Sequence, residues 1–155
     1  MFKITGCLMI VFSSVMIFMK NSIRDKTTYE FLKQTSELCR YIHLDCNNGK
    51  NYPDFFQNIG KYGLSYYRSF SFPYNDKNNI CITKYHIAEN VVIEVESFFR
   101  QLGKRTKEKE SEYLEYSINY FALKSDEYRR KYEKNRQLNF VTGMSAGIMI
   151  AIMIY

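Results

Sequence analysis

Two long apolar stretches lie near the ends of the chain, and a region rich in charged residues separates them. Residues 4–19 lie between two lysines and carry no charged side chain, and residues 138–155 carry none either. As helices, these stretches would be about 24 and about 27 Å long, close to the thickness of a thin hydrocarbon core. The pattern therefore predicts transmembrane helices at residues 1–20 and 138–155.

Three other interpretations of the N-terminal stretch are weaker than a retained membrane anchor. A cleaved signal peptide needs an A-x-A-like pattern of small residues at its cleavage site, and the segment MKNSIRDK lacks this pattern. The segment ITGC has the form of a lipoprotein signal at Cys7, but the apolar run follows this cysteine and does not precede it. A buried core helix is the remaining alternative for a run of this length.

Basic residues are concentrated on the inner flank of each apolar stretch. Lys20, Arg24 and Lys26 follow the first stretch, and five basic residues at positions 129–136 precede the second. Because cytoplasmic flanks of membrane helices carry an excess of Lys and Arg, both stretches favour the same orientation. We therefore expect a cell-membrane protein whose residues 21–137 are cytosolic and whose two termini face outward.

Between the ends, apolar residues recur at steps of three and four, which is the helical period. Residues 22–46 form one predicted helix, which the segment DCNNGKNY interrupts. Residues 87–102 keep the same period, although VVIEV is rich in the β-branched residues that favour strands. Gly103 is predicted to end that second helix.

A short helix and an aromatic segment are predicted between these two helices. Pro53 suits the first turn of a short helix, which Gly60 or Gly63 would close. The segment LSYYRSFSFPYNDKNN follows, and its aromatic residues are predicted to pack over the bundle. Its last part, YNDKNN, is typical of a loop.

The chain from Lys104 to Leu138 contains no glycine or proline and predicts one long helix that continues into the C-terminal apolar stretch. One face of this helix is predicted to carry Tyr113, Ser117, Phe121, Lys124, Tyr128 and Tyr132. The predicted fold is therefore all-α: an antiparallel helical bundle, residues 21–137, flanked by an N-terminal and a C-terminal transmembrane helix.

Composition adds a bias in charge and a bias toward aromatic residues. The formal net charge is +6, and the chain holds 14 Tyr and 12 Phe among its 46% hydrophobic residues. A positive charge favours nucleic acid, an anionic lipid surface or an acidic protein face as partner. The apolar stretches make the lipid bilayer the preferred one of these.

No convincing set of catalytic, cofactor-binding or metal-ligating residues is present in the sequence. It lacks a phosphate-binding glycine loop and an HExxH motif. Cys39, His43 and Cys46 share one helix face, and with Cys81 or His86 they could bind zinc. Structural zinc sites normally contain close pairs such as C-x2-C, so reduced core thiols beside a polar histidine are the favoured interpretation. We expect no enzyme, no cofactor and no small-molecule substrate.

The segment GKRTKEKE places basic residues at the start of the long helix. Its simplest interpretation is a solvated first turn, and docking to an acidic partner protein is the functional alternative. Nucleic-acid binding is disfavoured because no base-stacking or groove-reading motif accompanies the cluster. The candidate docking residues are Lys104, Arg105, Lys107 and Lys109.

Small residues form a stripe on the C-terminal apolar stretch. Gly143, Gly147 and Ala151 repeat every four residues, and Gly6 and Ser13 share a face of the N-terminal stretch. Such stripes allow two helix backbones to approach closely in a membrane. The stripe predicts helix packing, either within one chain or between chains.

Several segments, in their order and spacing, resemble the stage III sporulation protein AB family of endospore-forming bacteria. The segments are MFKITGCLMIVFSS at the start, YPDFFQNIG, FFRQLG at residues 98–103, and KN at residues 134–135 followed by Gly143 and Gly147. The chain departs from the family pattern where Thr106 and Glu110 replace an Asp and a Gln, so what it resembles is a divergent member of the family.

This resemblance implies a function that the residue pattern alone does not. The cytosolic domain of the family resembles platform domains of type II secretion and type IV pilus systems. It implies a non-enzymatic scaffold in the mother-cell membrane around the forespore, with sporulation-complex membrane subunits and a cytosolic secretion-type ATPase as partners. The alternative from sequence is a small two-span membrane regulator or pore-type protein unrelated to sporulation.

Overall fold

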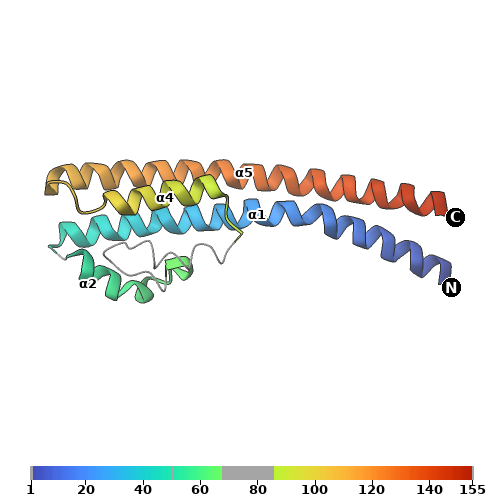
Figure 1. Cartoon of the computed structure of the whole chain (residues 1–155), viewed down its shortest axis with the longest axis horizontal. Helices are drawn as coiled ribbons and strands as arrows, with labels where there is room; N and C mark the ends of the chain where they lie inside the picture. The colour runs from blue at the N-terminus through green and yellow to red at the C-terminus, as the bar shows by residue number, and fades with distance from the viewer. Residues whose placement is uncertain (1, 50, 68–85, 155) are drawn as a thin grey trace. The chain divides into compact units, whose positions relative to one another are not determined.

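The computed structural model describes residues 2–49, 51–67 and 86–154, and these ranges are mostly helical (Figure 1). In chain order the elements are α1 (Phe2–Asn47), α2 (Tyr52–Gln57), the 3-10 helices η1 (Ile59–Tyr62) and η2 (Ser65–Tyr67), α4 (Glu89–Gln101) and α5 (Lys107–Ile154). These ranges contain no strand, so the predicted all-α class is confirmed.

The chain divides into two compact units, and both long helices contribute to each. Unit 1 comprises Met1–Lys26 and Tyr128–Tyr155, and unit 2 comprises Thr27–Glu127. The N-terminal apolar stretch and the predicted helix that follows it form the single helix α1. This continuity follows from the sequence, since no glycine or proline lies between Gly6 and Gly49.

Aromatic rings form much of the core of unit 2. Tyr67 is fully buried; its ring stacks on Phe31 of α1 with centroids 5.7 Å apart and lies 5.8 Å from Phe99 of α4. Phe98, on the same helix, meets Phe121 of α5 edge-on at 5.7 Å. Large rings supply apolar area with few rotatable bonds, so they suit a small core. The aromatics Tyr66 and Tyr67 thus pack into the bundle as predicted.

The buried hydroxyl of Tyr67 has a partner, as a buried polar group requires. It shares a hydrogen bond of 2.5 Å with Thr35 Oγ1 on α1. Burial raises the pKa of Tyr67 well above its ordinary value, and the bond to Thr35 only partly opposes this effect. A second α1 hydroxyl, Thr28 Oγ1, accepts a 3.0 Å hydrogen bond from the backbone N–H of Ala88, which holds the start of α4.

Within unit 2, α1 and α5 run antiparallel, and regularly spaced polar contacts join them. Ser125 Oγ donates to the carbonyl of Tyr29 at 3.3 Å, and Ser36 Oγ donates to the carbonyl of Ile118 at 3.0 Å. The next contact joins His43 and Ser111 at 2.8 Å. Each step covers seven residues on both helices, in opposite directions, which is the repeat of a left-handed helix pair.

The other predicted helices are found with small changes of boundary. Helix α4 confirms the helical interpretation of VVIEV, because Val91, Val95 and Phe98 face the core at steps of four and three. The long helix predicted after Gly103 is α5. Of the six residues predicted on one face, Ser117 and Phe121 are buried and the other four are half-buried. The buried residues of α5 also include Leu114 and Ser125, which the prediction did not name.

The predicted short helix is split into two elements. Helix α2 places Pro53 in its first turn, as expected, and ends at Gln57. Helix η1 continues the chain, and Gly63, at φ 69°, closes it. Gly60 lies inside η1 and does not end a helix. The predicted loop YNDKNN and Cys81 lie outside the described residues.

In unit 1, the two helix segments are also antiparallel. Gly147 lies opposite Val11, and Gly143 lies opposite Val15. Nearer to the charged part of the chain, Asn135 Nδ2 donates to Asp25 Oδ2 at 2.8 Å. Because Asp25 is nearly buried, this bond satisfies a carboxylate that would otherwise be costly, and it fixes the register of the pair.

Across the described ranges, none of the helices combines the length and the apolar character needed to cross a membrane.

Candidate functional site

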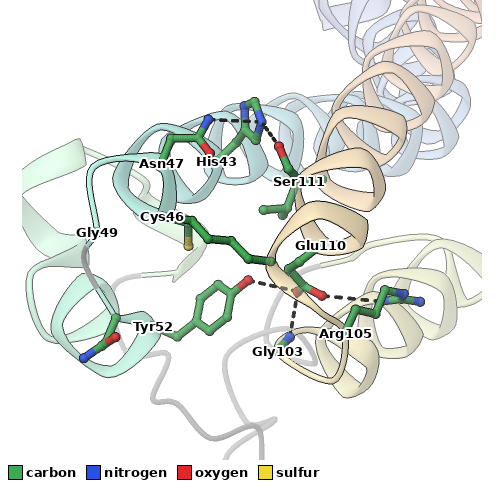
Figure 2. Close-up of a pocket in the computed structure, with 12 residues that line it drawn as sticks. His43, Cys46, Asn47, Gly49, Tyr52, Gly103, Arg105, Glu110 and Ser111 are labelled. Atoms are coloured by element: carbon green, nitrogen blue, oxygen red, sulfur yellow. Dashed lines mark hydrogen bonds and ion pairs between the residues drawn. The ribbon is translucent and has the colours of Figure 1, made fainter.

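A pocket of about 330 Å³ lies in unit 2, where α1 ends, α2 begins and α4 turns into α5 (Figure 2). Two glycines make the turns beside it. Gly49 follows α1 with φ 81°, and Gly103 follows α4 with φ 78°. Side chains with a Cβ rarely adopt this left-handed conformation, so glycine suits both positions. The lining residues are His43, Cys46, Asn47, Gly49, Asn51, Tyr52, Gly103, Arg105, Lys107, Glu110, Ser111 and Leu114.

Glu110, in the first turns of α5, is the central side chain of the pocket. Only 6% of the residue is exposed. Its Oε1 accepts hydrogen bonds from the backbone N–H of Gly103 at 2.7 Å and from the hydroxyl of Tyr52 at 2.9 Å (Figure 2). One carboxylate therefore joins α2, the α4–α5 turn and α5.

The second carboxylate oxygen of Glu110 is less well satisfied. Among the described residues, Oε2 is buried and has no hydrogen-bond partner. Within the described ranges it forms an ion pair with Arg105, whose Nη1 lies 3.9 Å away. This guanidinium is held by Gln101, to whose carbonyl and Oε1 it donates at 3.1 and 2.7 Å, and it stacks 3.6 Å above the ring of Tyr113. Arg105 is thus fixed in place at the pocket rim.

The thiol and phenol in the pocket are not activated. Burial raises the pKa of Cys46, and the hydrogen bond with Tyr52 offsets only part of this effect. Burial is also the main reason that the pKa of Tyr52 is raised, and its hydrogen bond to the Glu110 carboxylate adds to the shift. Both groups remain protonated near neutral pH, so neither is the charged nucleophile that covalent catalysis uses.

His43 and Ser111 resemble a catalytic pair at first sight, because Nε2 and Oγ are 2.8 Å apart. However, the amide of Asn47 lies 3.4 Å from the same ring nitrogen. No carboxylate within the described ranges hydrogen-bonds the other ring nitrogen to orient it, as a catalytic triad requires. The contact is better explained as a step in the seven-residue repeat between α1 and α5.

The predicted metal ligands do not converge in the described part of the chain. Cys39 is fully buried in the core, and Cys46 lines the pocket; both are free thiols. His86 lies just before α4 and is exposed. A search of the described residues for three or more His, Cys, Asp or Glu side chains able to hold a metal ion finds none.

The four predicted docking residues separate into two pairs. Arg105 and Lys107 line the pocket, whereas Lys104 and Lys109 are exposed and do not contribute to the lining. Sequence reasoning missed Tyr52 and Glu110, which hold the pocket together. Glu110 is one of two acidic residues at the helix start, with Glu108, so the local sequence does not single it out or identify its distant partners.

The predicted small-residue stripe occupies a second candidate site, inside unit 1. A Cβ placed on Gly143 would lie 2.9 Å from the Cα of Val15, and one on Gly147 would lie 2.7 Å from the Cα of Val11. Such distances are shorter than real contacts, so the two backbones approach as closely as glycine allows. The partner of this stripe is α1 of the same chain.

The other members of the predicted stripe are placed differently. A Cβ on Gly6 would meet nothing within 4 Å, and Ser13 is exposed, so neither lies at this close contact. The side chain of Ala151 lies outside the described positions.

Large apolar side chains in unit 1 are directed away from the contact between the helices. The exposed residues are Met9, Phe12, Met16, Ile23, Leu138, Phe140, Val141, Met144, Ile148, Met149, Ile150, Ile152 and Met153. Among the described side chains of unit 1, glycines occupy the closest contact between the helices, and these large apolar residues are exposed.

Comparison with known proteins adds no relative. No protein-family model matches the chain, and neither a curated protein nor a solved structure does. The resemblance to the sporulation family therefore rests on the quoted segments alone.

Proposed function

We propose that the chain is a non-enzymatic scaffold subunit of a membrane-bound, secretion-like sporulation complex, in which it couples a cytosolic ATPase to membrane partners. The observation that carries the membrane part of this proposal is the arrangement of unit 1. Glycines occupy the contact between its two helices, and large apolar side chains such as Phe12 and Met153 are exposed.

This arrangement is unfavourable in water and favourable in lipid. Burying apolar side chains in water contributes roughly 1.5–3 kcal/mol each, and unit 1 leaves many of them outside. In lipid, apolar burial gives little drive for helix association, so close packing of small residues takes its place. Exposed apolar patches of this extent mark a surface that contacts a partner or a membrane.

An insertion experiment tests the membrane part of the proposal. The protein is reconstituted with phosphatidylcholine vesicles and washed at alkaline pH, which removes peripheral proteins. We expect the protein to stay with the lipid, and its complete release would contradict the membrane assignment.

A pair of charge substitutions makes this experiment specific to the outer face of unit 1. Phe12→Arg places a charge on that face and should reduce the retained fraction strongly, because a charge in the hydrocarbon core costs about 2.5–3.5 kcal/mol. Tyr116→Arg is the matched control, since Tyr116 is exposed to a similar degree in unit 2. Equal retention of the two variants would argue against lipid contact at Phe12.

The docking part of the proposal rests on the pocket rim of unit 2. Arg105 and Lys107 give the rim positive charge, and Glu110 ties three chain segments into one rigid support. A rigid basic surface fits an acidic face on the ATPase. The absence of an activated thiol or a converging metal set in the described residues leaves a binding role as the simplest use of the pocket.

The docking claim is tested with purified protein and the secretion-type ATPase encoded by the same organism. Reversing the charges with Arg105→Glu and Lys107→Glu should weaken binding at least tenfold. Arg100→Glu is the control, because Arg100 is exposed on α4 and is not part of the pocket lining. If both proteins bind the ATPase equally, the rim is not the docking surface.

The sporulation context rests on the family resemblance and needs a test of its own. Deletion of the gene should lower the number of heat-resistant spores without affecting vegetative growth. Normal sporulation of the deletion strain would favour the alternative, a two-span regulator with another role.

A further inference from the structure

We propose that unit 1 binds an anionic phospholipid, with the headgroup phosphate at Arg136 and an acyl chain along Phe140. This inference rests on the proposed membrane function and adds the class of lipid and its position. It is based first on basic residues of unit 1, which are separate from the proposed docking surface of unit 2.

The first observation is a belt of basic residues at one level of the unit 1 helix pair. Asp25 on α1 contacts both Lys131 and Asn135 on α5, so the neighbours of Asp25 lie level with residues 131–135. The belt thus combines basic side chains from both helices, and all of them are exposed. They are Arg24, Lys26, Arg129, Arg130, Lys131, Lys134 and Arg136.

Basic residues outnumber acidic ones at this level of unit 1. Asp25 already accepts from Asn135 and lies 3.6 Å from Lys131, and Glu133 lies 3.9 Å from Arg129. Residues 24–26 and 129–136 contain seven basic and two acidic residues, so their formal net charge is +5. Basic clusters beside a membrane attract anionic lipid.

The second observation is a hollow at the boundary between the belt and the apolar stretch. Its volume is about 490 Å³, and its described lining is Glu133, Arg136, Gln137 and Phe140. These positions follow steps of three, one and three, so they lie on one face of α5. The order along the helix is polar first and apolar last, which matches a headgroup followed by an acyl chain.

The hollow lies where a lipid headgroup would be found if unit 1 is inserted. From Gln137 to the end of the chain no residue is charged, so Arg136 is the last cation before the apolar stretch. Its guanidinium can bind a phosphate with two parallel hydrogen bonds. Phe140, one turn further along α5, is half exposed and offers its ring to an acyl chain.

The test measures lipid preference by native mass spectrometry of the full chain. The protein, in a neutral detergent, is exposed to equal amounts of phosphatidylglycerol and phosphatidylcholine with identical acyl chains. We expect bound phosphatidylglycerol to exceed phosphatidylcholine at least fivefold. Arg136→Gln should lower this ratio about fivefold, and Arg136→Lys should retain most of it.

Matched controls identify the source of the effect. Arg100→Gln removes an exposed arginine of unit 2 and should leave the lipid ratio unchanged. Phe140→Ala should lower the amount of bound phosphatidylglycerol and leave the response to Arg136→Gln intact. An excess of glycerol 3-phosphate should displace no lipid, and displacement would show a site for free phosphate and overturn the proposal.

Failure of this inference can be distinguished from failure of the membrane function. If the protein stays in phosphatidylcholine vesicles but binds both lipids equally, the anionic site is disproved and the membrane function stands. If the protein leaves the vesicles completely, both are disproved.

Discussion

Helices α1 and α5 pack against each other in opposite ways in the two units. In unit 2 the helices face a core of large rings, including Phe31, Tyr67 and Phe121, and most exposed positions are polar. Among the described side chains of unit 1, Gly143 and Gly147 make the closest contacts, and large apolar residues such as Phe12 and Met153 are exposed. The same two helices therefore carry the pattern expected for water in one part and for lipid in the other.

Because of this difference, the stability of the two units depends on side-chain packing in different ways. In unit 2 stability depends on filling space with side chains, so removing a ring leaves a cavity. In unit 1 it depends on keeping side chains out of the contact, so adding even one methyl group causes a clash. Substitutions of opposite kinds should therefore be the damaging ones.

The largest effect is expected from a truncation in the core of unit 2. Tyr67→Ala removes a fully buried ring and leaves Thr35 without its hydroxyl partner, and it should lower the free energy of unfolding by about 3–5 kcal/mol. Chemical unfolding followed by circular dichroism measures this change. Tyr116→Ala, at an exposed position, is the control and should cost less than about 1 kcal/mol.

The next largest loss of stability is expected in unit 1, from adding a side chain. Gly147→Ala adds a single methyl group 2.7 Å from the Cα of Val11 and should cost about 1–3 kcal/mol, because backbone must move. Gly6→Ala is the matched control, since its Cβ meets nothing within 4 Å. It should be neutral or stabilise α1 by up to about 1 kcal/mol.

Thermal unfolding in detergent or lipid compares the two glycine variants. If Gly147→Ala is as stable as Gly6→Ala, the contrast between the units is wrong for unit 1.

A smaller effect is expected at the pocket of unit 2. Glu110→Ala leaves the N–H of Gly103 and the hydroxyl of Tyr52 without their acceptor, and it should cost about 2 kcal/mol. Glu108→Ala removes an exposed carboxylate from the same helix start and should change stability by less than about 0.5 kcal/mol. Equal costs would show that Glu110 does not hold the pocket together.

The smallest effect is on thiol reactivity. Burial raises the pKa of Cys39 strongly and that of Cys46 to a lesser degree, so at a given pH each has less thiolate than an ordinary cysteine. Maleimide labelling near neutral pH, mapped by mass spectrometry, should leave Cys39 unmodified and modify Cys46 slowly. The rate at Cys46 should rise only at a pH above that for a free cysteine. Rapid labelling of Cys39 in the folded protein would contradict the packing of the unit 2 core.

Periodicity in the sequence was sufficient to predict the main helices. The steps of three and four from Ile87 to Leu102 outweighed the β-branched run in α4, and the lack of glycine and proline predicted the length of α5. Local patterns are sufficient here because helical hydrogen bonds are local.

The pocket could not be predicted in this way. Glu110 meets Tyr52, which is 58 positions away in the chain, and only the folded structure brings them together. The glycine stripe shows a related limit: a stripe on one helix predicts close packing but does not identify the partner. The close contact of Gly143 with Val15 identifies α1 as the partner.

The most direct test of the contrast between the units uses the fact that the chain contains no tryptophan. Phe12→Trp in unit 1 and Tyr116→Trp in unit 2 each introduce a single fluorophore, at positions that are 68% and 66% exposed. The two proteins are reconstituted in vesicles, and emission is quenched either by brominated lipid or by aqueous acrylamide. We predict that brominated lipid quenches the tryptophan at position 12 and that acrylamide quenches the one at position 116. If acrylamide quenches both equally and brominated lipid quenches neither, the outer face of unit 1 is in water and the account is wrong.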